Sequence, residues 1–197
     1  MNIGIIGSGN VGLITAACFA DVGNNVFCCD IDKKKIDNLK KGIVSIYESG
    51  LERLIHKNLN SNLFFEDNID VVLSNSDIVF LTVGTPMSET GETDMCYIYD
   101  AAAQIGDYIN SKKLIITKST IPVGETHKIK KIIQGKINSR GIDITFDIAN
   151  NPEFLKEGKG IADFMSPDRI IVGVDDNNLK YLFESIYRPF SVNHQKL

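Results

Sequence analysis

Short apolar runs alternate with longer helical patterns along the whole chain, and this alternation restricts the fold more than any other feature. Apolar runs of strand length occupy residues 2–6, 25–30, 62–66, 77–83, 113–118, 144–150 and 168–174. Segments with a helical pattern lie at residues 10–22, 32–42, 50–59, 68–75, 95–109, 123–137 and 177–187. Strands joined by helical crossovers pair in parallel, with helices on both faces of the sheet. We therefore expect an α/β fold with one doubly wound, mainly parallel sheet over residues 1–197.

Charge and hydropathy patterning exclude several functional classes. The formal net charge of −4 argues against a nucleic-acid partner, because phosphate binding needs a basic surface. No run of about 18 apolar residues occurs, so we expect no membrane partner. The N-terminus passes from a strand-like run directly to glycine, which is unlike a signal peptide. Metal-ligand spacing is missing among the histidines, which are His56, His127 and His194.

The cysteines indicate a reducing compartment, and the cytoplasm is the expected location. No C-x-x-C pair occurs, which argues against a disulfide framework or a metal site. We expect buried thiols at Cys18, Cys28, Cys29 and Cys96. Cys28 and Cys29 are adjacent in a predicted strand, so their side chains should point to opposite faces of the sheet.

A glycine motif, "GSGNVG", lies between the first predicted strand and the first predicted helix. Gly7 allows a tight turn, Gly9 allows a pyrophosphate to approach the backbone, and Gly12 allows close helix–strand packing. The helix N-terminus adds unpaired N–H groups and a partial positive charge. In this strand–turn–helix context the motif predicts a dinucleotide site of the Rossmann type.

Asp30 ends the second predicted strand, where a carboxylate accepts hydrogen bonds from the adenosine ribose. A carboxylate there repels a 2′-phosphate, so NAD is favoured over NADP. Asp30 has a second interpretation as a helix cap before the lysine-rich segment. Residues 33–35 are lysines that form either a solvated face or, at Lys35, a contact with the cofactor.

Polar segments follow three other apolar strands, and the carboxyl ends of parallel strands are where ligands bind. They are residues 84–94, 119–126 and 150–158, with Thr120, Glu153 and Glu157 among them. If residues 153–157 are helical, the i, i+4 spacing places both carboxylates on one face. The alternatives are a solvated helix start for the glutamates and a helix cap for Thr120.

Six motifs occur together and in order: "GSGNVGLITAACFADVGNNVFCCDID", "IYESGLE", "VGTPMSETGETD", "TKSTIPVGET", "NPEFLKEG" and "PDRIIVGVD". With them the chain resembles the UDP-glucose/GDP-mannose dehydrogenase family, and most closely its UDP-glucose branch. The resemblance covers essentially all 197 residues. It departs from the family at Asn10, where Tyr is usual, and at Ser49, where Pro is usual.

The resemblance implies an NAD-dependent enzyme that oxidises UDP-glucose to UDP-glucuronate with two NAD⁺. The cofactor-binding residues are then expected at Gly7, Gly9, Asn10, Val11, Gly12, Asp30, Lys35, Gly84, Thr85, Pro86, Thr120 and Glu157. Substrate-binding residues are expected at Glu153, Phe154, Leu155, Lys156 and Glu157. Catalytic roles are expected for Thr120, Glu153 and Glu157: Glu153 and Thr120 position or activate water, and Glu157 lies near the nicotinamide.

The family's catalytic cysteine lies in a downstream motif that does not occur here. The chain is therefore expected to be the N-terminal NAD-binding half, lacking the connecting helix and the C-terminal UDP-sugar domain, and inactive alone. A homodimer is implied for the full-length enzyme. The UDP-N-acetylmannosamine and GDP-mannose branches, and a stand-alone NAD-binding module, remain as alternatives.

Overall fold

The computed structural model describes residues 1–88 and 91–191. The strands in these ranges are β1 (Asn2–Ile6), β2 (Asn25–Cys29), β3 (Leu63–Glu66), β4 (Ile78–Leu81), β5 (Lys113–Thr117), β6 (Phe146–Asn150) and β7 (Gly173–Val174). The helices are α1 (Asn10–Asp21), α2 (Lys33–Lys40), α3 (Leu51–Asn58), α4 (Ile69–Asn75), α5 (Cys96–Tyr108), α6 (Glu125–Ser139), α7 (Gly160–Met165) and α8 (Lys180–Tyr187). Short 3-10 helices precede and follow α8, at Asn177–Leu179 and Arg188–Phe190. His194 and two residues of the segment 84–94 lie outside the described residues.

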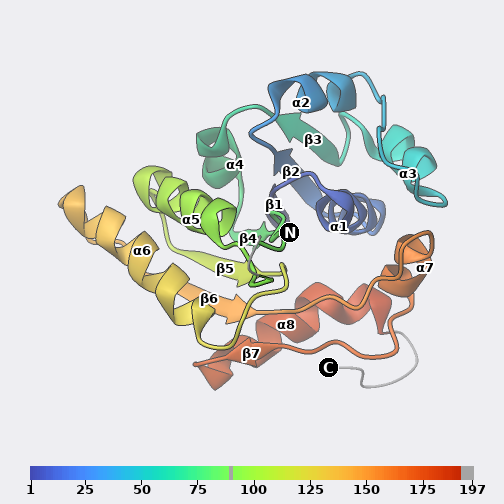
Figure 1. The fold of residues 1–197 in the computed structure, drawn as a ribbon. Helices are drawn as coiled ribbons and strands as arrows, with labels where there is room; N and C mark the ends of the chain where they lie inside the picture. The colour runs from blue at the N-terminus through green and yellow to red at the C-terminus, as the bar shows by residue number, and fades with distance from the viewer. Residues whose placement is uncertain (89–90, 192–197) are drawn as a thin grey trace.

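The strands form one sheet in the order β3-β2-β1-β4-β5-β6-β7, which Figure 1 shows from the top to the bottom of the view. The pairs from β3 to β6 are parallel, and only the pairing of β6 with β7 is antiparallel. The strand order reverses between β1 and β4. After β1 the chain adds β2 and β3 on one side, and it then crosses to form β4 on the other side of β1. The prediction of a doubly wound, mainly parallel sheet is confirmed.

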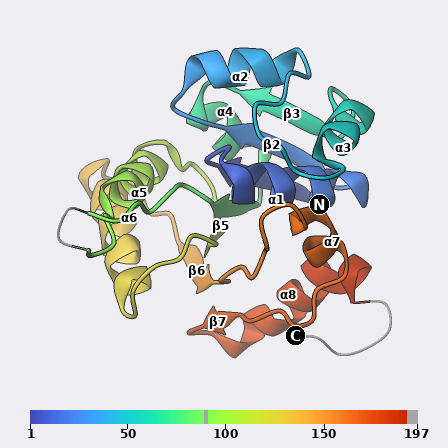
Figure 2. The ribbon, with the colours of Figure 1, turned by 45° about the vertical axis from the view of Figure 1, so that its right-hand side comes forward.

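Alternating side chains of the central strands build a separate core on each face of the sheet. Ile5 packs in one core with helices α1, α2, α3, α7 and α8, and Ile6 packs in the other with α4, α5 and α6. Figures 1 and 2 show these two helical layers on opposite sides of the strands. Cys28 and Cys29 are divided between the two cores as predicted. Apolar side chains on both faces explain why the strands read as near-continuous apolar runs.

An aromatic cluster ties the last elements of the chain to α1. The ring of Phe19 lies 5.3 Å from that of Phe164 on α7, 5.9 Å from Tyr187 on α8 and 5.6 Å from Phe190. Edge-to-face geometry in two of these pairs is the arrangement that aromatic quadrupoles favour. The cluster fixes the segment that follows β6 against the first helix. Within the described residues, no helix combines the length and the apolar character that a membrane span requires.

The predicted strand over residues 168–174 is wrong in length, because only Gly173–Val174 pair with β6. Beside this pairing, Asn151 Nδ2 donates to the carbonyl of Ile171 at 2.8 Å, so a side chain and not a strand bonds this carbonyl. The predicted burial of Cys96 is also wrong. Cys96 is exposed at the first position of α5, since Ile98, Ala102 and Ile105 occupy the buried face of that helix.

Candidate functional site

A large concave site lies at the point where the strand order reverses. A cavity of about 670 Å³ opens at the carboxyl ends of β1, β2 and β4 and reaches the first turns of α5. Gly7, Gly9, Asp30, Thr82 and Gly84 are among its lining residues. In open α/β sheets, ligands bind in the crevice at this position, because neighbouring connections there turn to opposite faces. We name this cavity the crevice.

The three glycines of the first motif have different environments. Gly7 has a φ of +104°, and a Cβ there would lie 2.8 Å from the backbone nitrogen of Val83. A Cβ on Gly12 would lie 1.9 Å from the carbonyl oxygen of Gly7. A Cβ on Gly9 would meet no atom within 4 Å. Gly7 and Gly12 therefore serve the contact of α1 with the sheet, whereas the space at Gly9 is open to a ligand.

The N-terminus of α1 is suited to an anion. Gly9 is its N-cap, and no side chain caps the first turn. No acidic residue lies in that turn either, so the partial positive charge of the helix end is not offset. In the same turn Asn10 Oδ1 is buried and accepts no hydrogen bond from any described residue; as an acceptor it does not itself attract an anion.

Asp30 is held as a carboxylate at the crevice wall. Its Oδ2 accepts from the backbone N–H and the hydroxyl of Ser8, both at 2.7 Å, and its Oδ1 accepts from the N–H of Asp32 at 3.1 Å. Burial alone raises the pKa of Asp30, but these hydrogen bonds and the charge of Lys35 together lower it. The helix-cap alternative is not realised, since Asp32 caps α2 by accepting from the N–H of Lys35.

The lysines after β2 differ in their surroundings. Lys35 Nζ lies 3.5 Å from Asp30 Oδ2, and the side chain of Lys35 is 22% exposed. Lys33 and Lys34 are exposed. The solvated-face interpretation thus describes Lys34, whereas Lys33 and Lys35 line the crevice and Lys35 is the one paired with Asp30.

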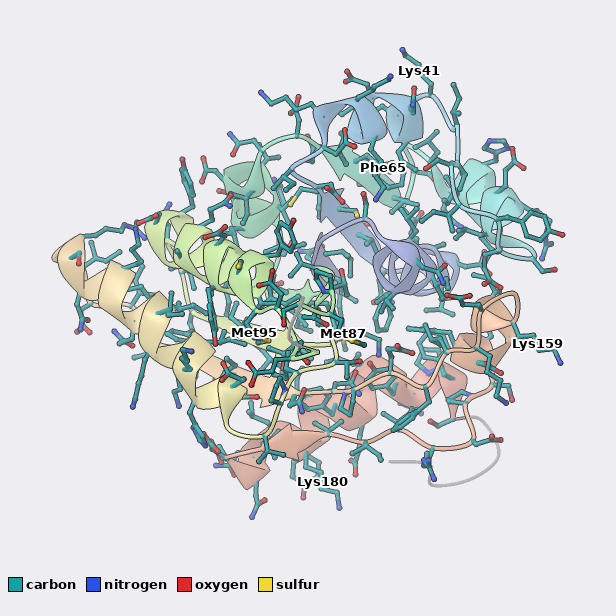
Figure 3. The ribbon with its side chains drawn as sticks, in the orientation of Figure 1. Lys41, Phe65, Met87, Met95, Lys159 and Lys180 are labelled. Atoms are coloured by element: carbon teal, nitrogen blue, oxygen red, sulfur yellow. The ribbon has the colours of Figure 1, made fainter. Side chains whose placement is uncertain are left out.

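The loops after β4 and β5 are joined by hydroxyl groups. Thr85 Oγ1 donates to the carbonyl of Thr120 at 3.0 Å, and Ser119 Oγ donates to the carbonyl of Val83 at 2.6 Å. These bonds place residues 84–86 beside Thr120. Thr120 is exposed and does not cap α6, whose N-cap is Gly124. Met87 and Met95, labelled in Figure 3, lie in the later part of the connection between β4 and α5.

Residues 151–156 are not helical, so Glu153 and Glu157 do not share a helix face. Glu153 instead folds back and accepts from the N–H of Leu155. A second cavity, of about 290 Å³, lies between this loop and the segment after α7. Its lining includes four predicted substrate residues, Glu153, Phe154, Leu155 and Lys156. Among the described residues, Thr120 and Glu157 line neither the crevice nor this second cavity.

Two buried charged groups near the loop were missed by the sequence analysis. Lys118 is 4% exposed at the end of β5, and its Nζ donates to Asn151 Oδ1 at 3.2 Å. Tyr187 donates to the same oxygen. Burial lowers the pKa of Lys118 to about 8, an effect that the charge of Glu153 opposes. Glu48 is the second group and is 5% exposed. The available signal for Lys118 was its place directly after the apolar run of β5, at the carboxyl end where ligands bind.

The four thiols are in their protonated form. Burial raises the pKa of Cys18 and of Cys29 to about 12 and that of Cys28 well above its usual range. The hydrogen bond from Cys96 Sγ to Asp94 Oδ1 raises the pKa of Cys96 as well. A lowered pKa is what makes a cysteine nucleophilic at neutral pH, and each of the four has a raised one.

The family comparison agrees with this geometry. The family model for the NAD binding domain of the UDP-glucose/GDP-mannose dehydrogenase family matches residues 1–191. The chain belongs to this family. Its members are dehydrogenases, and NAD is the cofactor of the matched domain.

Curated relatives and solved structures extend the likeness. The chain is 43% identical over 189 residues to the UDP-glucose 6-dehydrogenase TuaD of Bacillus subtilis (strain 168), covering 95% of this chain and 40% of the relative. It is 41% identical to a UDP-glucose 6-dehydrogenase of Rhizobium meliloti (strain 1021), covering 100% and 45%. The crystal structure of a GDP-mannose dehydrogenase from Pseudomonas aeruginosa matches with a TM-score of 0.89 at 31% identity, covering 95% of this chain and 44% of that one. The chain thus spans less than half the length of these relatives.

Proposed function

We propose that this chain is the NAD-binding half of an enzyme that oxidises UDP-glucose to UDP-glucuronate with two NAD⁺ per sugar. One observation carries the proposal: the crevice and the loop 151–157 lie at the same carboxyl edge of the sheet, after β1 and after β6. A cofactor in the crevice and a sugar at the loop then meet near the ends of β4 and β5. The named UDP-glucose 6-dehydrogenases of similar sequence support this substrate.

The adenosine and pyrophosphate groups are assigned to the ends of β1 and β2. The open space at Gly9 and the uncapped N-terminus of α1 suit the pyrophosphate, with Asn10 and Val11 in the first turn. Asp30 suits the ribose, since Oδ1 accepts only one hydrogen bond from the described residues and retains a lone pair. Lys35 is assigned to the same ribose region on the basis of its place beside Asp30.

The nicotinamide end is assigned to the hydroxyl-linked loops, at Gly84, Thr85, Pro86 and Thr120, with Glu157 nearby. When bound, NAD⁺ supplies the hydride acceptor. The family resemblance implies a thioester between the oxidised sugar and the family's catalytic cysteine. Glu153 is assigned as the base or positioning group for the water that hydrolyses it, because a carboxylate beside a reacting carbonyl activates water. The nucleophilic thiol is assigned outside this chain, since the cysteines present are buried or hydrogen-bonded as thiols.

Asp30→Ala is expected to weaken NAD⁺ binding by about 1–3 kcal/mol, because a charged acceptor of ribose hydroxyls is removed. Isothermal titration of the chain with NAD⁺ and with NADP⁺ measures this. The unmutated chain should prefer NAD⁺, and the variant should lose most of that preference. Asp37→Ala, at an exposed acid on α2, is the matched control and should leave both affinities unchanged. Equal affinities of the unmutated chain for the two cofactors would contradict the role of Asp30.

The substrate is tested with the full-length protein by NADH absorbance. UDP-glucose should give two NADH per sugar consumed, and GDP-mannose and UDP-N-acetylmannosamine should give little turnover. The likeness to a GDP-mannose dehydrogenase structure makes that branch the second candidate. Turnover with GDP-mannose alone would select it, and the binding of NAD⁺ without turnover of any sugar would favour the stand-alone binding module.

A further inference from the structure

Glu48 is a buried carboxylate that bonds to a distant segment of the chain. It lies in the connection between α2 and α3 and is 5% exposed. Its Oε2 accepts from the N–H of Gly158 and its Oε1 accepts from the N–H of Gly160, both at 2.9 Å. These glycines follow the loop that carries Glu153 and Glu157. More than 100 residues separate Glu48 from both of them.

The bonding pattern accounts for the buried charge of Glu48. The ion pairs found in the described part of the chain do not include it. Each carboxylate oxygen instead accepts one backbone N–H, from Gly158 in the turn before α7 and from Gly160 at the first position of α7. A buried charge without these two donors would be costly, so Glu48 and the segment 158–160 depend on each other.

The same segment packs closely against α1. A Cβ on Gly160 would lie 2.4 Å from Ile14 Cδ1, so this backbone lies directly against the helix. Figures 1 and 2 both show α7 beside α1, and in Figure 3 Lys159 projects outward from the turn that precedes α7. The far end of the loop is therefore fixed from two sides, by Glu48 and by α1.

The near end of the loop has its own buried anchor. Asn151 Oδ1 accepts from Lys118 and from Tyr187, and Asn151 Nδ2 donates to the carbonyl of Ile171. Between the two anchors the side chains of Phe154 and Glu157 are exposed. The peptide that joins Glu157 to Gly158 carries one of the N–H groups bound by Glu48, so Glu48 fixes the backbone directly beside Glu157.

We propose that Glu48 is a positioning residue, which sets the place of Glu157 relative to the nicotinamide end of the crevice. The inference rests on the proposed function, in which Glu157 lies near the nicotinamide. Glu48 lines neither the crevice nor the cavity at the loop. It acts through the backbone of residues 158–160 and does not touch the cofactor or the substrate.

Titration of the chain with NAD⁺ and with ADP-ribose separates positioning from general support of the fold. ADP-ribose keeps the adenosine, the pyrophosphate and both riboses but lacks the nicotinamide. Glu48→Gln keeps the size of the side chain and replaces one acceptor with an amide donor, which cannot accept from an N–H. The variant should bind NAD⁺ about tenfold more weakly, as expected for the loss of a charge-assisted hydrogen bond that holds Glu157. Its affinity for ADP-ribose should stay unchanged.

Hydrogen exchange gives an independent readout at the bonded groups. The amides of Gly158 and Gly160 should exchange slowly in the unmutated chain and faster in Glu48→Gln, with the amides of β1 and β4 unchanged. Glu48→Asp is the second variant; its shorter carboxylate should keep one of the two bonds and give an intermediate NAD⁺ affinity. Glu52→Gln, at an exposed acid four residues away, is the matched control.

The outcomes separate this inference from the proposed function. Unchanged NAD⁺ affinity in Glu48→Gln, with normal binding by the unmutated chain, would overturn the positioning role and leave the NAD site intact. An equal loss of NAD⁺ and ADP-ribose binding would assign Glu48 to the support of the whole fold and would also overturn it. Failure of the unmutated chain to bind either ligand would overturn the proposed function together with the inference.

Discussion

Gly12→Ala is expected to lower the free energy of unfolding by about 3 kcal/mol or more, at the upper end of what overpacking costs. The added Cβ would lie 1.9 Å from the Gly7 carbonyl oxygen and 2.8 Å from Thr82 Oγ1. Neither group is free to move, because Thr82 Oγ1 donates to that same carbonyl at 2.8 Å and the N–H of Gly7 donates to the carbonyl of Cys29 at 2.9 Å. The helix α1 must therefore move away from β1, which disturbs the core that Ile5 shares with α1.

Urea denaturation followed by circular dichroism measures the loss. Gly9→Ala is the matched control, since a Cβ there meets no atom within 4 Å and the φ of −67° suits alanine. Gly9→Ala should leave stability nearly unchanged and weaken NAD⁺ binding, because its methyl group occupies the space assigned to the pyrophosphate. Equal stability of the Gly12→Ala and Gly9→Ala variants would show that the contact between α1 and β1 adapts more easily than the geometry indicates.

Local signals explain why most of the fold could be predicted from the sequence. A strand covered on both faces, such as β4, is recognised by a continuous apolar run. A position where a Cβ would clash, such as that of Gly12, is recognised by a glycine at a fixed place in the motif. The crevice could therefore be placed from Gly7, Gly9 and Asp30 alone, and the structure brings these three residues to one wall.

The rest depended on contacts between residues far apart in the sequence. Residues 168–172 have the composition of a strand, but the side chain of Asn151 takes a carbonyl of this segment. Residues 151–157 carry two acids at helical spacing, but contacts with Lys118 and Glu48, which lie in distant parts of the chain, anchor the two ends of this segment. The periodicity of a segment does not show which distant residues will bond to it. The exposure of Cys96 was missed because a single residue at a helix end can face either way.

Lys118→Met is expected to change how stability depends on pH. Burial lowers the pKa of Lys118 from its usual 10.5 to about 8. Between these values the folded chain has released a proton that the unfolded chain still holds, so stability rises with pH through this window. The lysine is charged in both states below about pH 8, and its burial then costs about 3 kcal/mol, from the difference of about 2.5 pKa units. Methionine fills the same space without the charge and should remove this cost.

The decisive quantity is the stability of the unmutated chain minus that of Lys118→Met, measured by urea denaturation at a series of pH values. This difference should rise by about 3 kcal/mol from below pH 8 to above pH 10.5. The difference is needed because two buried thiols change stability in the opposite direction. Burial raises the pKa values of Cys18 and Cys29 to about 12, so these thiols ionise in the unfolded chain at a lower pH than in the folded chain. Their ionisation lowers the free energy of unfolding as the pH rises. Those contributions are common to both proteins and cancel.

Lys34→Met, at an exposed lysine on α2, should give a flat difference. A flat difference for Lys118→Met as well would mean that Asn151, the rings of Phe164 and Tyr187, and the charge of Glu153 stabilise the buried ammonium fully. The anchor of the loop would then be a permanent cation and not a group that titrates near pH 8.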